Sequence, residues 1–348
     1  MTRYTDHLIH IECNVKQALF KLNELSQDAI LFVVDDKNKL IGSLTDGDVR
    51  RGLMNGFSLD NSIGLIIQEK VHSIKKGQID IKKIIKYRDE NLRIIPIVDE
   101  KNIVVNVINF RHKKSYLPID AVIMAGGRGQ RLQPLTDLQP KPLLKVGDKP
   151  IMEYNLDRLS KFGVYDFWIS VKYLGEQIES YFGSGNDRNI NIKYVWETEP
   201  LGTLGAVSKI HNFSHDYVLI TNSDLLTNID YEHFFLHFIE HDADLAVLTI
   251  PYQINIPYAV LETHDSVIKS FKEKPTYTYY SNGGVYLVKK NLLKFIPSDT
   301  LYNTTDFMEY LIKNNYKVVS YPFLGYWLDI GKHDDFEKAQ KDIKNILL

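Results

Sequence analysis

The segment AVIMAGGRGQRLQPLTDLQPKPLLKVGDKP, residues 121–150, is the one around which the rest of the chain is organised. It opens with a short apolar run, which predicts a buried strand, and leads directly into a glycine turn. A strand that feeds such a turn presents backbone N–H groups to a phosphate. The turn holds three glycines, which let the backbone approach an anion closely, and two arginines, which add positive charge. These five residues are Gly126, Gly127, Gly129, Arg128 and Arg131.

The spacing of this turn differs from the P-loop and from the dinucleotide fingerprint. A dinucleotide-binding oxidoreductase is disfavoured because Arg131 stands where close packing of the helix on the strand requires glycine. The glycine turn alone is a weak signal. The Pro-Lys-Pro sequence at 140–142 and the second Lys-Pro at 149–150 make the stretch specific.

Composition places the chain among ordinary globular proteins. Its 348 residues leave room for two domains, and 44% hydrophobic with 25% charged residues is typical of soluble proteins. The net charge of −2 gives no argument for nucleic acid or for an anionic membrane. Cys13 is the single cysteine, which excludes an internal disulfide and a cysteine-built zinc site. The N-terminus lacks the apolar core of a signal peptide and no apolar run approaches the length of a transmembrane helix, so we expect a cytoplasmic protein.

The N-terminal third contains an internal repeat of about 60 residues. LFVVDDKNKLIGSL at 31–44 and IPIVDEKNIVVNVI at 95–108 share the order apolar strand, acidic turn, apolar strand. Residues 14–23 have helical spacing ahead of the first copy. Two such half-units resemble a tandem pair of cystathionine-β-synthase-type (CBS) domains, a small α/β unit covering residues 1–115.

The resemblance to CBS domains implies a regulatory site for an adenine nucleotide, AMP or ATP. In that family a Gly-x-x-Thr-x-x-Asp element holds the ribose, and the first repeat has Gly42, Thr45 and Asp48 in this pattern. The second repeat offers NVINFR at 106–111, without the Thr and Asp, so at most one complete site is expected. The alternative stays open that Asp48 only caps a helix beginning near Val49 and that the pair is a dimerisation module.

A basic stretch ending at Pro118 predicts a short linker, and we place the boundaries at 1–115, 116–119 and 120–348. From Ile119 onward apolar strands alternate with helical segments, which indicates an α/β fold with a mostly parallel sheet covered on both faces. The predicted strands are 121–124, 166–171, 190–195, 217–220 and 243–250. The predicted helices are 150–163, 175–181 and 202–211, followed by a more antiparallel region from 284.

After the opening stretch with PKPLLKV and KPIMEY, five further motifs follow in the order EPLGTLGAV, NSDLL, FKEKP, NGGVY and WLDIGKHDDF. Together they resemble the signature of the sugar-1-phosphate nucleotidylyltransferases over residues 119–340. The resemblance implies a Rossmann-like, GT-A-like nucleotidyltransferase domain. It also implies attack of a sugar 1-phosphate oxygen on the α-phosphorus of a nucleoside triphosphate, releasing pyrophosphate. Such a reaction needs positioning and charge neutralisation rather than a protein nucleophile.

The resemblance assigns a role to each matching position. Catalysis falls to Arg131, Lys141 and Asp224. Nucleotide binding falls to Gly126, Gly127, Gly129, Glu197, Gly202 and Thr203. Contact with the sugar phosphate falls to Glu273, Lys274, Asn282 and Gly283. The metal, expected to be Mg²⁺ because its ligands are hard oxygens, falls to Asp224 and Asp329. One departure is Lys332, where many relatives have Thr.

The base is expected to be read near Glu197, because a carboxylate can accept from both N1–H and N2–H₂ of guanine. The EPLGT context resembles mannose-1-phosphate-type guanylyltransferases, so GTP is favoured over dTTP, UTP and CTP. By analogy the product serves surface-glycan synthesis. The alternative class is an adenine-nucleotide-sensing protein with a non-catalytic transferase domain. A homo-oligomer is expected, with neither nucleic acid nor membrane as a partner.

Overall fold

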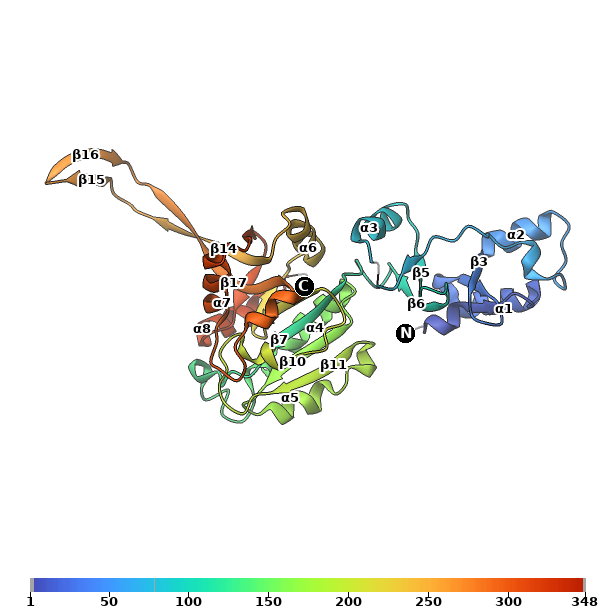
Figure 1. Ribbon diagram of the computed structural model, residues 1–348, viewed down its shortest axis with the longest axis horizontal. Coiled ribbons are helices and arrows are strands. Elements are labelled where there is room, and N and C mark those ends of the chain that lie inside the picture. Colours follow the sequence, from blue (N-terminus) through green and yellow to red (C-terminus); the bar gives the residue numbers. More distant parts are fainter. Residues whose placement is uncertain (1–2, 78, 347–348) are drawn as a thin grey trace. The chain divides into compact units, whose positions relative to one another are not determined.

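The computed structural model describes residues 3–77 and 79–346 (Figure 1). Contacts divide the chain into two units, Met1–Leu117 with Lys161–Gly163, and Pro118–Ser160 with Val164–Leu348. None of the described helices is long and apolar enough to cross a membrane.

The first unit contains two three-stranded sheets of the same topology. In each sheet the first strand lies parallel to the second, and the second lies antiparallel to the third. Each sheet also has a register irregularity one residue before the end of its middle strand, so the internal repeat of the sequence is a structural repeat. The strands are β1 (Leu8–His10), β2 (Ile30–Val34), β3 (Leu40–Thr45), β4 (Ile74–Lys75), β5 (Ile94–Val98) and β6 (Val104–Asn109).

Helices α1 (Val15–Leu25), α2 (Asp46–Met54) and α3 (Ile81–Asp89) complete this unit. Helix α2 begins at Asp46, three residues before the predicted start, because Thr45 is its N-cap. The buried face of α1, which includes Ala18 and Leu22, packs into one apolar core with β2 and β3. A separate apolar core forms under α3 and the second sheet.

The second unit is built on a seven-stranded sheet of order β11-β10-β7-β12-β17-β14-β18. Four neighbouring pairs are parallel, and the two pairs that β17 makes with β12 and β14 are antiparallel. The predicted α/β fold with a mostly parallel sheet is confirmed. The strands are β7 (Ile119–Met124), β10 (Asp166–Val171), β11 (Asn191–Trp196), β12 (Tyr217–Asn222), β14 (Leu245–Asn255), β17 (Thr276–Lys289) and β18 (Val318–Pro322).

Helices α4 (Ile151–Lys161), α5 (Gly175–Phe182), α6 (Tyr231–Glu240), α7 (Thr304–Lys313) and α8 (His333–Asp342) surround this sheet. The predicted helix 202–211 is wrong in extent, since only a short 3₁₀ helix forms there, η7 (Gly205–Lys209). Gly202 has a φ of +77°, a left-handed conformation that a helix cannot include. Short strand pairs β8 (Lys145–Val146) with β9 (Lys149–Pro150), and β13 (Leu225–Thr227) with β19 (Trp327–Asp329), flank the sheet.

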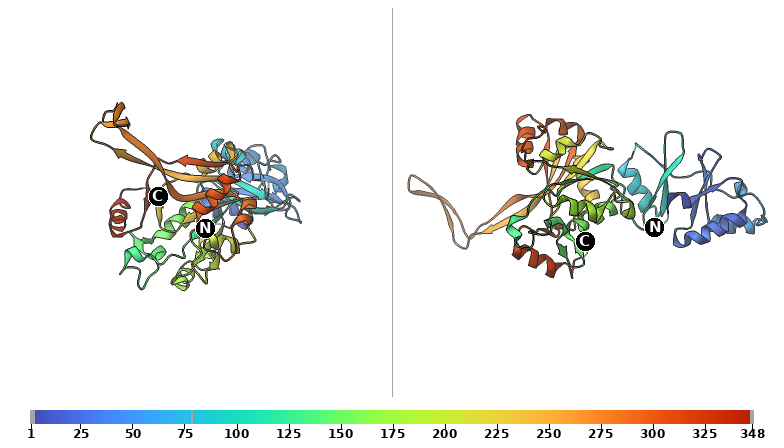
Figure 2. Two further views of the ribbon diagram at one scale, coloured as in Figure 1. Left: turned by 60° about the vertical axis from the view of Figure 1, so that its left-hand side comes forward. Right: turned by 90° about the horizontal axis from the view of Figure 1, so that it is seen from below.

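One part of the second unit leaves the sheet altogether. β14 and β17 continue as a two-stranded ribbon beyond the sheet and lead to a hairpin of β15 (Val260–His264) and β16 (Val267–Lys272). Figure 1 and Figure 2 show this segment, residues 251–281, protruding from the unit; we call it the arm. The sequence predicted a strand ending at 250 and did not predict the arm.

Candidate active site

The glycine turn lies at the carboxyl end of β7, at the mouth of a cleft with a volume of about 1190 Å³. β12 pairs in parallel with β7 in such a register that Asn222 lies beside Met124, so both strands end at the same sheet edge. Open α/β sheets bind ligands at this edge. The cleft lining combines the turn, the end of β12 and the 197–203 loop.

The three glycines of the turn have different surroundings. A Cβ at Gly126 would stand 2.6 Å from Glu197 Oε1, and one at Gly129 would stand 3.0 Å from Thr136 Cγ2. Gly129 also has a φ of +66°. A Cβ at Gly127 would meet no atom within 4 Å, because this residue faces the open cleft. Gly126 and Gly129 are therefore required by packing, whereas Gly127 leaves space for a ligand.

Lys141 and the two predicted metal ligands come together from three segments. Lys141 lies in the 3₁₀ helix η5 (Lys141–Leu143), is largely buried, and donates from Nζ to Asp224 Oδ2. Asp224 directly precedes β13, which pairs with β19 in a register that sets Leu225 opposite Asp329. The Asp224 carbonyl accepts from the N–H of Ile330 at 3.1 Å, which ties the two carboxylate segments together.

The electrostatics of this pair fit a divalent cation. Asp224 Oδ1 and Asp329 Oδ1 are both buried and have no hydrogen-bond partner. Burial, reinforced by the neighbouring Asp224 carboxylate, raises the pKa of Asp329 to about 6. Two unpaired oxygens on adjacent carboxylates constitute a costly arrangement that a bound cation would stabilise. Lys141 and Arg131 act in the opposite direction and lower that pKa.

Arg131, in the 3₁₀ helix η4 (Gln130–Leu132), extends its guanidinium to within 3.6 Å of the position a Cβ on Gly331 would take. It lies in the cleft lining with Lys141 and Asp224, so the three predicted catalytic residues are brought together. Arg128 lies over the ring of Tyr173, 5.4 Å from its centroid. Lys332, the departure from the family pattern, is exposed and pairs with Asp334 at 3.5 Å.

Glu197 lines the cleft, but it also has a structural task. Its Oε1 accepts from the Ser170 hydroxyl, and its Oε2 accepts from the N–H of Leu201 at 3.1 Å. These bonds hold the end of β11 against β10 and anchor the 197–203 loop. Each carboxylate oxygen can accept a second hydrogen bond, so reading of the base by Glu197 stays a prediction.

Gly202 and Thr203 also lie in the cleft wall. The Thr203 N–H donates to Asn303 Oδ1 at 3.3 Å, and the N–H of Thr304 donates to Thr203 Oγ1 at 3.0 Å. A Cβ on Gly202 would meet Asn303 Oδ1 at 2.7 Å. Both residues thus fix the cleft wall to the start of α7.

The four residues predicted to contact the sugar phosphate are divided by the structure. Asn282 and Gly283 lie at the base of the arm, next to Gly284, whose Cβ would stand 2.7 Å from the cleft residue Asn222. Glu273 and Lys274 lie part-way along the arm, between β16 and β17, and are exposed; neither is among the described residues that line the cleft. Lys274 adopts a φ of +43°, which is unusual for a residue other than glycine. Their contact with a sugar phosphate stays a prediction.

Asn155 was not singled out in the sequence analysis, although it holds the backbone on both sides of Asp224. Asn155, buried on α4, donates from Nδ2 to the carbonyls of Leu225 at 2.9 Å and Ser223 at 3.5 Å, the two neighbours of Asp224. A polar residue among the buried positions of the predicted helix was the available signal.

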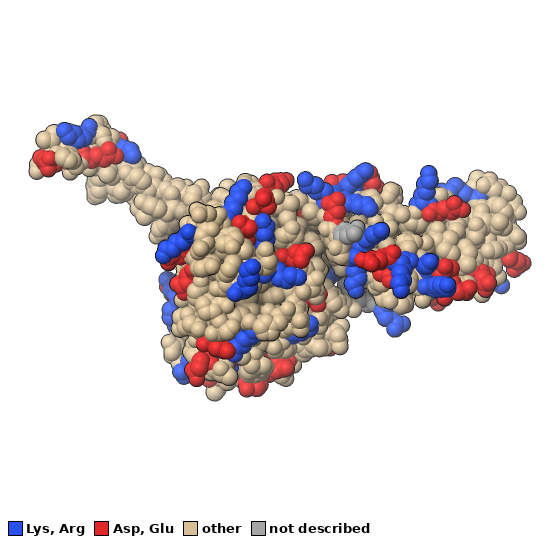
Figure 3. Space-filling model, viewed as in Figure 1, with Lys and Arg blue, Asp and Glu red and all other residues tan. Residues whose placement is uncertain are grey.

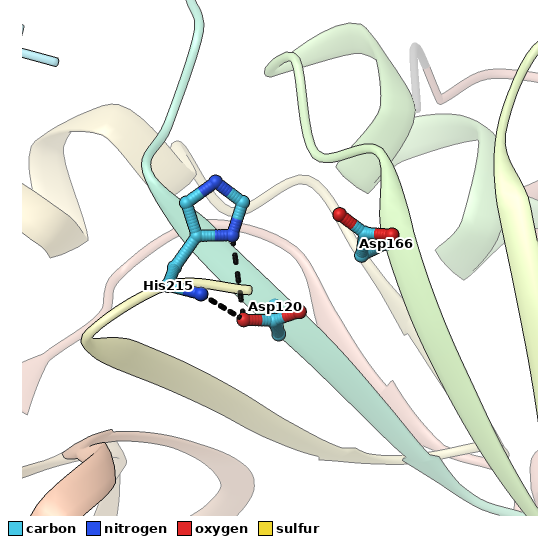
Figure 4. A group of neighbouring side chains, drawn as sticks. All are labelled: Asp120, Asp166 and His215. Atoms are coloured by element: carbon cyan, nitrogen blue, oxygen red, sulfur yellow. Dashed lines mark hydrogen bonds and ion pairs between the residues drawn. The ribbon is translucent and has the colours of Figure 1, made fainter. Parts of the chain in front are cut away.

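A second acidic group lies at the opposite edge of the sheet (Figure 4). Asp120, Asp166 and His215 bring potential ligand atoms within 4.8 Å of one another. Asp120 is fully buried, and its oxygens accept from the N–H groups of Ser214 at 3.1 Å and His215 at 2.8 Å. This group therefore fixes the turn into β12, at the amino ends of the strands.

Comparison with known proteins agrees with the geometry of the cleft. The family described as Nucleotidyl transferase matches residues 120–346, and the CBS domain family matches residues 5–55. The chain therefore belongs to the nucleotidyl transferase family and carries an N-terminal CBS domain.

Relatives extend the assignment. A D-glycero-alpha-D-manno-heptose 1-phosphate guanylyltransferase of Aneurinibacillus thermoaerophilus is 34% identical over 234 residues, 66% of this chain and all of that protein. A UTP–glucose-1-phosphate uridylyltransferase of Synechocystis is 29% identical, with 65% of each chain covered. A mannose-1-phosphate guanylyltransferase of Mycobacterium tuberculosis is 28% identical over 65% of this chain and 64% of that protein. The chain thus spans about two thirds of the length of the latter two.

Among solved structures, HddC from Yersinia pseudotuberculosis complexed with GMP-PN is 26% identical, with a TM-score of 0.50, over 64% of this chain and 99% of that one. A structure described as a glucose-1-phosphate thymidylyltransferase from Bacillus anthracis supports the fold. It is 21% identical, with a TM-score of 0.53, and the match covers 66% of this chain and 97% of that one. With these relatives, the chain is placed among the sugar-1-phosphate nucleotidylyltransferases.

Proposed function

We propose that the protein transfers a guanylyl group from GTP to a sugar 1-phosphate and releases pyrophosphate, with Mg²⁺ held by Asp224 and Asp329. The observation that carries this proposal is the pair of buried, unpartnered carboxylate oxygens of Asp224 and Asp329 next to Lys141 and Arg131, two residues that line the cleft. The metal would supply positive charge next to the phosphates. In the reaction, the new bond joins the sugar-phosphate oxygen to the α-phosphorus while the bond to pyrophosphate breaks.

The residues of the chain perform positioning and neutralisation. The backbone at the exposed face of Gly127 is open to the triphosphate, and Arg131 offsets the charge of the departing pyrophosphate. Lys141 is held by Asp224 in a partly buried position, where its charge is weakly screened by solvent. With the metal and the substrate bound, Lys141 would interact both with the Asp224 carboxylate and with a phosphate of the substrate.

The choice of GTP is supported by the guanylyltransferase relative matched over its full length and by the solved relative with GMP-PN. The uridylyltransferase relative keeps UTP as the competing candidate. The sugar is proposed to be one that enters a surface glycan. Four triphosphates assayed against a panel of sugar 1-phosphates, with pyrophosphate release as the readout, test the proposal directly. Turnover should require both substrates and be highest with GTP.

Asp224→Asn should lower kcat/KM on the order of a hundredfold or more, because it removes one negative charge from the metal pair. Asp216→Asn is the matched control, since that side chain is 88% exposed and pairs with Lys290 on the surface. Release of pyrophosphate without a sugar phosphate, or full turnover in Asp224→Asn, would contradict the proposal.

A regulatory adenine nucleotide at the first CBS repeat is a second proposal. Thr45 and Asp48 are adjacent, and the Asp48 carboxylate accepts from the Thr45 N–H at 2.8 Å, the Thr45 hydroxyl at 2.6 Å and Gln68 Nε2 at 3.0 Å. A ribose would have to compete with these partners. Calorimetric titration with AMP and with ATP tests it: binding that disappears in Asp48→Ala supports the site, whereas absence of heat leaves Asp48 a helix cap.

A further inference from the structure

The arm is exposed along its whole length. No residue from Pro251 to Asn282, all of which the structure describes, is buried. Nine of its large apolar side chains are between 44% and 76% exposed. They are Tyr252, Ile254, Tyr258, Leu261, Val267, Ile268, Phe271, Tyr279 and Tyr280. An isolated two-stranded ribbon is marginally stable in water, so this surface is expected to be covered.

The stem of the arm, residues 251–259 and 275–281, contains no Lys, Arg, Asp or Glu. Exposed strand edges are normally protected from unwanted pairing by charges. Figure 3 shows charged residues gathered at the tip and an uncharged stem. The stem therefore has the composition of a contact surface rather than of a solvated loop.

The apolar side chains lie mainly on one face of the stem. Tyr252 stands opposite Tyr279, and Ile254 stands opposite Tyr277, and these pairs share a face because they alternate along the strands. The other face carries the polar pairs Gln253–Thr278 and Asn255–Thr276, with Tyr280 opposite Pro251 at its inner end. A ribbon that is apolar on one face and polar on the other is built to be covered on one side.

The arm carries two residues that its own cleft lacks. β14 runs parallel to β18 and in the same direction as β12, so the arm leaves the sheet at the edge where the cleft opens. Strand β17 extends from Asn282 out to Thr276, about 20 Å at the ordinary rise of a strand. Glu273 and Lys274 follow beyond that point, while the described cleft lining contains no residue of the arm.

We propose that the arm lies on a second copy of this chain in a reciprocal exchange, and that each arm brings Glu273 and Lys274 to the sugar side of the partner's cleft. The role of the two residues rests on the proposed function. A second copy is the partner because it holds the cleft that these residues would complete. The size also fits a stable interface of about 20–30 residues a side, because in a reciprocal exchange each chain contributes one face of its own arm and the surface that receives the partner's arm. A twofold arrangement uses both arms equally.

The interface is tested by the mass of the assembly, independently of activity. The double variant Tyr252→Lys with Tyr279→Glu keeps an attractive cross-strand pair, but its two charges disfavour burial of the apolar face. The control, Gln253→Lys with Thr278→Glu, introduces the same two charges on the polar face. Sedimentation of the full chain should show that the first double variant halves the assembly and that the control leaves it intact. A monomeric wild type, or an assembly unaffected by the tyrosine variant, would overturn the exchange.

Delivery in trans is tested by complementation. Lys274→Ala and Asp224→Asn chains are co-expressed with different tags and purified through both, so that each dimer has one intact cleft facing one intact arm. Delivery in trans predicts that the mixed dimer has about half of the wild-type specific activity, since one of its two equivalent sites is complete. Activity no higher than that of either variant alone would place the arm over its own cleft and overturn delivery, as would full activity of Lys274→Ala.

The proposed function and the exchange of the arm are contradicted by different results. A wild-type protein that releases no pyrophosphate with any pair of substrates contradicts the proposed function, and the sedimentation result then still decides whether the arm is exchanged. A halved assembly in the tyrosine variant with an active wild type supports both.

Discussion

Gly127 and Gly129 lie two residues apart in the same turn, but they differ in what a side chain would encounter. At Gly129 a Cβ would meet Lys141 Cβ at 3.1 Å, and φ is +66°. Gly129→Ala should therefore lower the free energy of unfolding by about 1–2 kcal/mol or more, because L-residues are disfavoured in this conformation. Denaturant titration measures the change.

Gly127→Ala serves as the matched variant. Because an added Cβ there meets no atom within 4 Å, stability should stay within about 0.5 kcal/mol of wild type. KM for the triphosphate should nevertheless rise, because the methyl group occupies space that the phosphates approach. Equal stability losses in the two variants would show that the turn is not shaped as described.

Asp48 gives a second prediction at the scale of one residue. It closes the capping box of α2 with Thr45, and its side chain is almost fully buried. Asp48→Ala should cost about 1–2 kcal/mol of unfolding free energy, the usual range for a lost N-terminal cap. Asp46→Ala is the control, because Asp46 makes an exposed pair with Arg50 at 2.8 Å, and such pairs contribute little.

The effect of Asp48 should depend on pH. Burial favours the neutral acid, but hydrogen bonds from Thr45 and Gln68 and contact with Arg51 outweigh it and lower the pKa of Asp48. A lowered pKa contributes stability above the pKa of the unfolded residue, about 3.9, and loses it as pH falls through the folded value. The difference between wild type and Asp48→Ala should be full at pH 7 and decrease below about pH 4. A constant difference would contradict the hydrogen-bonded carboxylate.

At the scale of an element, helix α4 supports the metal site. Asn155 holds the carbonyls on both sides of Asp224, so Asn155→Ala should let this carboxylate move. We expect kcat to fall about tenfold and the Mg²⁺ concentration for half-maximal activity to rise, because supporting contacts tune ligand geometry. Tyr154→Phe, which removes one hydrogen bond from the neighbouring residue to the Val146 carbonyl at 2.7 Å, is the control. An unchanged Mg²⁺ requirement in Asn155→Ala would leave the residue with a packing role alone.

Glu197 connects two elements and the cleft, which makes its substitution informative. Glu197→Gln should lower activity with every triphosphate, because an amide cannot accept from both Ser170 and Leu201 N–H. If Glu197 also reads guanine, the ratio of kcat/KM for GTP to that for UTP should fall about tenfold or more. An equal loss for both triphosphates would assign Glu197 to structure and base reading to another residue.

For the whole molecule, we predict that residues 115–348 alone release pyrophosphate with kcat/KM within about threefold of the full chain. A relative matched over its entire length covers 66% of this chain, and the transferase family matches residues 120–346. A transferase domain of this size can bury its own core. The isolated domain should also retain the assembly attributed to the arm. Loss of activity in a folded fragment, judged by circular dichroism, would assign the N-terminal unit a catalytic contribution.

Much of the fold and of the site could be predicted because the relevant signals are local. The apolar run before Gly126 predicted β7, and 217–220 predicted β12, each followed by the residues that line the cleft. Asn155 was missed because its importance depends on carbonyls about 70 positions away in the chain. The bonds that occupy Glu197 were missed for the same reason, since Ser170 and Leu201 meet it only after β10 and β11 pair.

The class of fold, the internal repeat and the class of reaction could be predicted from the amino-acid sequence alone, because strand periodicity, glycine turns and motif order depend on neighbouring residues. The pairing of Asp224 with Asp329 appears only in the folded chain, because strands β13 and β19 bring together two residues that are about a hundred positions apart. Each of the two carboxylates then has one oxygen without a hydrogen-bond partner. The tertiary structure alone also separated Lys274 from the cleft. The FKEKP motif indicates a sugar-binding role, but the direction in which a ribbon leaves a sheet is set by long-range pairing of β14 with β17.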